Sequence, residues 1–148
     1  MSKIFIYYSH SGNGEAVADY LKEKGIDVRK VIPKKELSQK MVPSILVGGF
    51  KATINYKDKL KDFDDDVKEY DEVIIGSPIW NARFSSPINT VLSQVKLDGK
   101  KVSFVLYSAS GTSAKATEKV KGLYPDAQII DLKEPKKNKE ELAKLDVL

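Results

Sequence analysis

The sequence KIFIYYSHSGNG, residues 3–14, joins an unbroken apolar run to a short loop of serine, histidine, glycine and asparagine. β-Branched and aromatic side chains fill positions 4–8 without alternating with polar ones, which is the pattern of a strand buried on both faces. An amphipathic stretch follows from Glu15 to Lys24, and Gly25 provides a C-terminal stop. The order of strand, polar loop and helix indicates an α/β protein.

Four further runs have the character of buried strands. They are Asp27 to Ile32, Glu72 to Ser77, Lys101 to Tyr107 and Ala127 to Leu132. Helical patterns lie between them, and strict alternation of this kind requires right-handed crossovers and a parallel sheet covered on both faces. We therefore expect a three-layer sandwich around a five-stranded parallel sheet, with ligands at the carboxyl edge of the strands.

Four more helices are expected from capping signals and apolar spacing. They are Lys57 to Lys68; a helix capped by Ser86 with Pro87 in first position; Ser113 to Lys121 with Gly122 behind it; and a last helix from Asn138, with Glu141 as capping-box partner and Leu142 and Leu145 buried. The stretch from Pro33 to Tyr56 has no clear period and is interpreted as an irregular connection or a lid.

Length and composition favour one domain over residues 1–148. The 148 residues are 41% hydrophobic, enough for one core and too few for two comfortable domains. No apolar run of membrane-spanning length and no signal-peptide pattern is present, so we expect a cytoplasmic protein that does not bind membranes. Because the chain has no cysteine, any redox chemistry has to come from a cofactor.

The formal charge of +4 does not indicate nucleic-acid binding, because the lysines are spread along the chain among 21 acidic residues. Within short segments the balance of charge differs in sign. Lys57 to Glu72 carries eight acids against four lysines, and Arg29 to Lys40 carries five basic residues against one acid. Such blocks are ordinarily solvated faces, although they can also steer a redox partner protein.

The first candidate site is the loop after the first strand, formed by Ser9, His10, Ser11, Gly12, Asn13 and Gly14. Hydroxyls at alternate positions, glycines that allow close backbone approach and the unpaired amides of a helix N-terminus together make a phosphate cradle. The competing interpretation is a plain turn with a helix cap. His10, the sole histidine, is either simply exposed or helps to hold a phosphate or relay a proton.

Other phosphate-binding motifs do not fit this loop. No Lys-Ser or Lys-Thr pair closes it, which excludes the Walker pattern. Val17 occupies the third glycine position of a dinucleotide fingerprint, and residues 32–34 lack the acid that should end the second strand. A phosphoacceptor receiver needs acids at residues 8–9 and 76–77, where none is present.

The second candidate site follows the third strand and consists of Ser77, Pro78, Ile79, Trp80 and Asn81. Trp80 is the only tryptophan, and a tryptophan on a loop at the carboxyl edge can stack on a planar heterocycle. The alternative is an anchor at the edge of the core. A third polar loop, with Ser108, Ser110, Gly111 and Thr112, follows the fourth strand; an N-cap by Thr112 or Ser113 explains its composition equally well.

These loops resemble those of the flavodoxin family, and the resemblance spans nearly the whole chain. In that family a hydroxyl-rich loop binds the phosphate of flavin mononucleotide (FMN), and Ser9, Ser11, Gly12 and Asn13 match it. Gly14 stands where the family usually has threonine, which implies one lost phosphate hydrogen bond. The resemblance implies the strand order 2-1-3-4-5, contacts of the second loop with the flavin N5 edge, stacking by Trp80, and a third loop around the pyrimidine side.

The function implied by the resemblance is an FMN-binding electron carrier with redox proteins as partners, as a monomer or homodimer. The basic composition weakens this reading, because such carriers are usually acidic. An FMN-dependent NAD(P)H:quinone-type reductase is one alternative, and Arg83, if it lay near the flavin, would suit it. A flavin-free binding module on the same fold is the other alternative, supported by Gly14.

Overall fold

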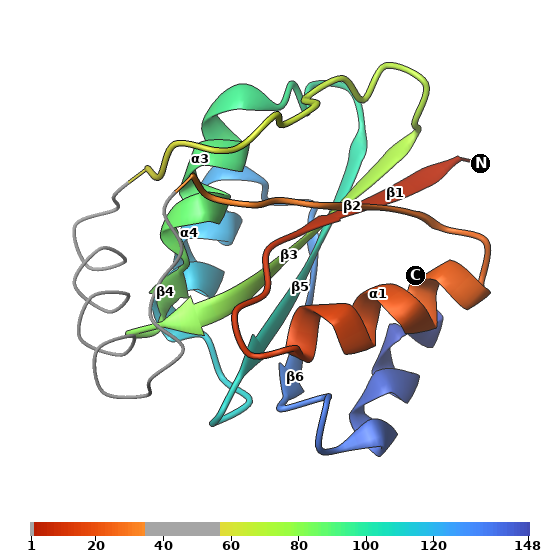
Figure 1. Cartoon of the computed structure of the whole chain (residues 1–148), viewed down its shortest axis with the longest axis vertical. Coiled ribbons are helices and arrows are strands. Elements are labelled where there is room, and N and C mark those ends of the chain that lie inside the picture. The colour runs from red at the N-terminus through yellow and green to blue at the C-terminus, as the bar shows by residue number, and fades with distance from the viewer. Residues whose placement is uncertain (1, 35–56) are drawn as a thin grey trace.

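A parallel sheet forms the centre of the computed structural model, which describes residues 2–34 and 57–148 (Figure 1). Its parallel strands are β1 (Lys3–Tyr7), β2 (Asp27–Lys30), β3 (Glu72–Trp80), β5 (Lys101–Ser108) and β6 (Gln128–Lys133). They lie in the order β2-β1-β3-β5-β6, with Gly76 of β3 opposite Tyr7 on one side and Val105 on the other. Counted by themselves, these five strands follow the order 2-1-3-4-5, so the predicted fold class is confirmed.

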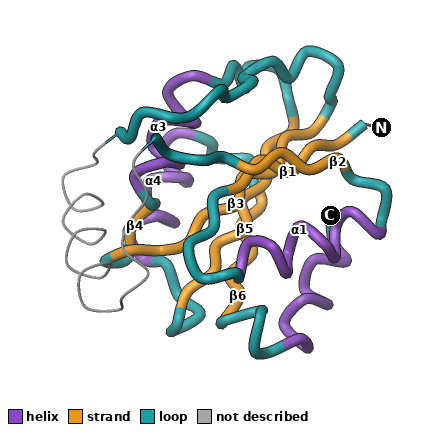
Figure 2. Tube along the Cα trace, in the orientation of Figure 1, coloured by secondary structure: helices purple, strands orange, loops and turns teal. Residues whose placement is uncertain are grey.

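Helices cover both faces of the sheet and complete the three layers. Helix α1 (Asn13–Glu23) and the 3-10 helix η1 (Lys139–Val147) lie on one face, and α3 (Ser86–Gln94) and α4 (Ala114–Leu123) lie on the other (Figures 1 and 2). The crossovers therefore place the first loop at the start of α1, directly beyond the end of β1.

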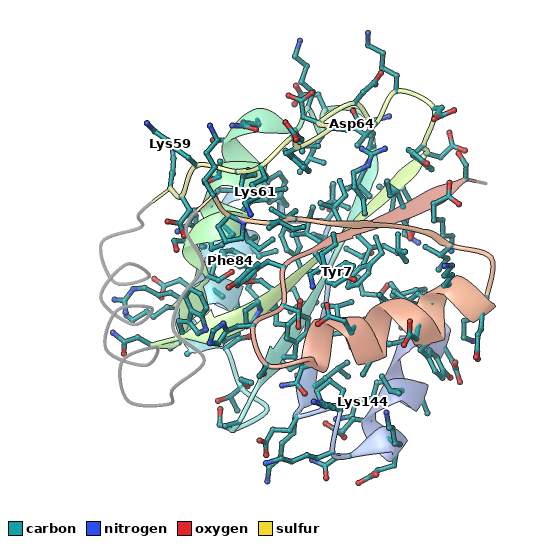
Figure 3. The ribbon with its side chains drawn as sticks, viewed as in Figure 1. Tyr7, Lys59, Lys61, Asp64, Phe84 and Lys144 are labelled. Carbon is teal, nitrogen blue, oxygen red and sulfur yellow. The ribbon has the colours of Figure 1, made fainter. Side chains whose placement is uncertain are left out.

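Strand β1 shows why an apolar run without alternation was required. Phe5 and Tyr7 pack with α1 and η1, whereas Ile4, Ile6 and Tyr8 pack with α3 and α4. The sheet separates the two cores. Of the residues labelled in Figure 3, Tyr7 belongs to the core under α1 and η1, and Phe84 belongs to the core under α3 and α4. A strand between two cores needs an apolar side chain at every position.

The third strand does not end where the sequence predicted. Strand β3 runs on to Trp80, and β4 (Arg83–Phe84) returns antiparallel to it, with Trp80 paired to Arg83. Asn81 and Ala82 form the turn with φ angles of 52° and 62°, the conformation of a tight two-residue hairpin. The predicted loop is therefore a β-hairpin, and the sheet has a sixth, short strand.

The predicted helix over Lys57 to Lys68 is wrong, because this segment is irregular and contains no helix. The amide of Lys61 donates to the carbonyl of Ile32 at 2.7 Å, so the segment runs beside residues 32–34. Asp64 and Asp66 accept hydrogen bonds from the amides two residues further on, at 3.0 and 2.9 Å. Aspartates that bond to nearby backbone in this way compete with helix formation.

Three helix ends also differ from expectation. Helix α3 has Ser85, not Ser86, in the N-cap position, and Gly122 lies inside α4. Helix η1 does begin after Asn138 and buries Leu142 and Leu145. Glu141 makes no capping box, because one of its carboxylate oxygens accepts the amide of Lys133 at 2.7 Å.

The irregular connection or lid expected over Pro33 to Tyr56 falls largely on residues 35–56, which lie outside the described residues. Within the described part of the chain, none of the helices has the length and apolar character needed to cross a membrane.

Candidate functional site

The carboxyl ends of β1, β3 and β5 meet at one edge of the sheet and bring the three predicted loops together. The amide of Tyr8 donates to the carbonyl of Gly76 at 3.1 Å, and the hydroxyl of Tyr107 donates to the carbonyl of Tyr8. The ring of Trp80 meets that of Tyr8 edge-on, with 5.8 Å between centroids. The first and second loops are therefore fixed next to each other by direct contacts.

Ser9 organises the first loop from within. Its side chain is buried, and its hydroxyl oxygen accepts the amides of Gly12 at 3.2 Å and Gly14 at 3.0 Å. Gly12 has a φ of 97°, a conformation that favours glycine. The hydroxyl thus acts as an acceptor for the start of α1, and no acceptor for its own proton is found among residues 2–34 and 57–148.

Other donors of the loop are not used within the described residues. No hydrogen bond of the backbone amides of Ser11 or Asn13 is found there, and Asn13 uses its side chain to donate to the Ser11 hydroxyl at 3.4 Å. The Nδ1 atom of His10 is buried and has no partner in the same part of the chain. The N-terminus of α1 therefore presents amides that an anion can accept from.

Gly14 lies against two tyrosines. A Cβ at this position would be 2.6 Å from Ser9 Cβ, 2.8 Å from the Tyr107 hydroxyl and 2.9 Å from Tyr7 Cδ2. Real Cβ atoms do not come this close, so the threonine usual in the family has no room here. Gly14 is required by its neighbours, and its amide is still held by Ser9.

Tyr7 sits below the first loop with its hydroxyl next to Glu15. Burial, and then the charge of Glu15 and a hydrogen bond to it, raise the pKa of Tyr7 to about 12. The Glu15 carboxylate also lies 3.4 Å from the ammonium of Lys30. The one acidic side chain in the first turn of α1 is therefore already engaged by a phenol and a cation.

The residues predicted in the second loop divide into two groups. Ser77 is fully buried and its hydroxyl contacts that of Ser85 at 3.0 Å, so it supports the start of α3 rather than lining the edge. Pro78, Ile79 and Trp80 are half-buried in β3, and Asn81 is exposed at the turn. Arg83 is half-buried and donates to the Asn81 carbonyl at 3.1 Å, which fixes the hairpin turn.

The third loop is closed by its own hydroxyls. The Ser108 hydroxyl oxygen accepts the Gly111 amide at 2.9 Å. The hydroxyls of Ser110 and Thr112 form a hydrogen bond of 2.9 Å. Ser113 is the N-cap residue of α4, although its side chain donates to Asp131 at 2.6 Å. This loop lies at the predicted edge with its hydroxyls already paired.

Lys136, in the segment between β6 and η1, was not predicted from the sequence to lie at the site. Its amide donates to the Asn13 side chain at 3.1 Å, and its ammonium lies close to Gly12. The segment 133–139 holds four lysines and looks like an ordinary solvated loop. The segment follows the last strand and therefore lies at the carboxyl edge of the sheet, which is the one feature of the sequence that could have placed Lys136 near the site.

A cationic recess lies beside the hairpin, between β4 and α4. The cavity has a volume of about 620 Å³, and Arg83, Lys115 and Lys119 line it together with the ring of Phe84. The ammonium of Lys119 lies 5.8 Å from the centroid of that ring. Burial, and then the nearby charge of Lys57, lower the pKa of Lys119.

A parallel sheet with this strand order, a polar loop between β1 and α1 and an aromatic residue at the end of β3 define a flavodoxin-like α/β protein. A family model described as Flavodoxin matches residues 2–146, and the chain belongs to the flavodoxin family.

Solved structures share this fold. A protein from Bacteroides eggerthii DSM 20697 is 23% identical, covers 99% of this chain and 96% of its own, and superposes with a TM-score of 0.73. A flavoprotein from Lactobacillus acidophilus NCFM, solved in complex with FMN, is 19% identical over 94% of this chain and 97% of its own, with a TM-score of 0.71. Oxidised flavodoxin 2 from Bacillus cereus is 18% identical over 97% of this chain and 92% of its own, with a TM-score of 0.54. No curated protein matches the chain.

Proposed function

We propose that the protein binds FMN at the carboxyl edge of its sheet and serves as an electron carrier. The observation that carries this proposal is the junction of the two loops: the ring of Trp80 meets edge-on that of Tyr8, the residue directly before the first loop, and the amide of Tyr8 donates to the carbonyl of Gly76, directly before the second loop. An anion cradle beside a half-buried aromatic ring suits a ligand with a phosphate at one end and a flat heterocycle at the other.

The residues of the first loop fit the phosphate. Ser11 and Asn13 offer amides, and Ser9 keeps a hydroxyl proton after accepting two amides. Gly14 does not count against FMN, because its amide takes part in the cradle through Ser9 and its missing side chain is replaced by the packing of Tyr107. The packing of Ser9 and Tyr107 accounts for Gly14, which weakens the support that this residue gives to a flavin-free binding module.

Trp80 supplies the surface for the flavin ring. It is half-buried, held at the end of β3 by pairing with Arg83 and edge-on against Tyr8, so its orientation is set before a ligand arrives. Bound FMN supplies the electron-transfer chemistry, and the protein supplies orientation and an altered potential. No catalytic side chain is required.

A specific observation favours the reductase as second candidate. The recess next to β4 carries Arg83, Lys115 and Lys119 around the ring of Phe84, a combination that suits an anionic co-substrate such as NADPH. Glu118 also lines the recess and lies 4.0 Å from Lys115, which lowers its net positive charge. We therefore rank the carrier first.

The test is a visible spectrum of the purified protein with and without added FMN, followed by anaerobic reductive titration. Flavin bands that shift on binding, with two separate one-electron steps on reduction, would support the carrier. Direct two-electron bleaching by NAD(P)H would support the reductase. A protein that neither carries nor takes up FMN would exclude both.

A further inference from the structure

The side chain of Lys136 lies over the first loop. A Cβ placed on Gly12 would be 3.0 Å from Lys136 Cδ and 3.1 Å from its Nζ atom. The stem of the lysine therefore lies against Gly12, the residue directly before α1, and the ammonium is close to the same residue. Gly12 leaves the room that this side chain occupies.

The position of Lys136 is fixed by its backbone. Its amide donates to Asn13 Oδ1 at 3.1 Å, so the segment is tied directly to the first loop. Upstream, the amide of Glu134 donates to the Ser108 carbonyl at 3.0 Å, and Glu134 has a φ of 41°. Downstream, the Asn138 side chain donates to the Lys133 carbonyl at 2.9 Å. The segment is thus held at three points around Lys136.

The ammonium has no opposite charge of its own within the described residues. The neighbouring Lys137 pairs with Glu134 at 3.5 Å, whereas no ion pair involves Lys136 in that part of the chain. The nearest acid in the first turn of α1, Glu15, is taken up by Tyr7 and Lys30. A cation therefore stands at the mouth of an anion cradle and lacks a counter-charge there.

We propose that Lys136 binds the terminal phosphate of FMN and makes the site selective for the phosphorylated flavin. This rests on the proposed function and names a residue beyond the hydroxyl-rich loop that carries the family resemblance. An ammonium within reach of the phosphate adds a charge-assisted hydrogen bond and offsets the phosphate charge. The ammonium of Lys136 compensates for the threonine hydroxyl that the family usually has at the position of Gly14.

The experiment compares the dissociation constants of FMN and riboflavin for the wild type, Lys136→Ala and the matched control Lys137→Ala. Quenching of Trp80 fluorescence reports both ligands. We expect Lys136→Ala to weaken FMN about tenfold and to leave riboflavin within about twofold, since a charge-assisted bond to phosphate is lost. Lys137→Ala, which removes the same charge one residue away, is expected to change FMN affinity less than about twofold.

A second readout uses inorganic phosphate as a competitor of FMN. Inorganic phosphate is expected to weaken FMN binding by competition in the wild type, and to do so less in Lys136→Ala. Lys136→Arg is expected to recover most of the FMN affinity, because the charge is kept. Unchanged urea midpoints for the variants will show that folding is not the cause.

The outcomes separate the two proposals. If the wild type binds FMN and Lys136→Ala binds it equally well, or loses FMN and riboflavin in parallel, this inference is wrong while the proposed function stands. If the wild type binds no FMN, the proposed function is wrong and this inference falls with it.

Discussion

The hydroxyl oxygen of Tyr107 lies 2.8 Å from the point where a side chain at Gly14 would begin. The same hydroxyl donates to the Tyr8 carbonyl, so it is held in place by the end of β1. The departure of this chain from the family loop at position 14 is therefore paired with a tyrosine on β5. Gly14 and Tyr107 form one structural unit at the first loop.

Gly14→Ala is expected to lower the free energy of unfolding by about 1–3 kcal/mol, because the added methyl group would overlap Ser9 and Tyr107. Urea denaturation followed by far-UV circular dichroism measures this. The control is Gly122→Ala in α4, where a Cβ meets nothing within 4 Å and a gain of about 0.5–1 kcal/mol is expected. Equal effects of the two substitutions would contradict the packing described for Gly14.

Ser9→Ala is expected to lower stability by about 1 kcal/mol, since the amides of Gly12 and Gly14 lose their common acceptor. Ser11→Ala is the matched control, because the Ser11 hydroxyl is exposed and, among the described residues, makes a hydrogen bond with Asn13 alone. Its expected effect is below about 0.5 kcal/mol. FMN affinity, measured in parallel, should fall in Ser9→Ala; full retention would remove Ser9 from the proposed cradle.

Trp80→Ala is expected to weaken flavin binding about tenfold through loss of stacking, with FMN and riboflavin affected alike. Trp80→Phe keeps an aromatic face and should lose less. Isothermal titration calorimetry gives both constants without relying on the tryptophan signal. A loss confined to FMN would place the residue near the phosphate instead of the ring.

Ala82→Gly is expected to raise the free energy of unfolding by about 0.5–1 kcal/mol, because alanine at a φ of 62° is strained and glycine is not. In the exposed loop after β5, Ala109 is not among the residues with positive φ, so Ala109→Gly should be destabilising. Thermal unfolding of the two variants supplies the comparison. A loss of stability in Ala82→Gly would contradict the tight turn between Trp80 and Arg83.

Tyr7→Phe is expected to make the protein less sensitive to alkali. The pKa of Tyr7 is raised from 10.0 to about 12, so the folded chain holds a proton that the unfolded chain has lost between these values. The stability that this group contributes is complete below pH 10 and disappears as the pH rises through about 12. Other tyrosines also have raised pKa values, so the difference between Tyr7→Phe and the wild type over pH 9–12 is the quantity to measure. A constant difference would show that Tyr7 is not linked to the alkaline transition.

The sheet could be predicted from sequence because apolar runs such as residues 4–8 are unambiguous when a strand is buried on both faces. The three loops followed from parallel strands ending at one edge. The hairpin after β3 was missed, because its turn holds Asn81-Ala82 and not the Asn-Gly pair that usually marks such a turn.

The other differences between the predicted and the observed structure arise from residues whose partners are distant in the sequence. A helix was expected over residues 57–68, but Arg29 of β2 donates to the carbonyls of Asp64 and Asp66 and holds this irregular segment in place. Lys136 meets Gly12 only because β6 and α1 are brought together by the fold. No spacing rule along the chain connects residues so far apart.

The bond between Asn13 and Lys136 joins the beginning of the chain to a segment translated more than a hundred residues later. During synthesis, β1 and α1 leave the ribosome long before this segment does, and a domain generally folds as a unit. The first loop therefore stays without Lys136 until β6 has joined the edge of the sheet and η1 has packed against it. On the proposed function, FMN binding is then a step that follows completion of the fold.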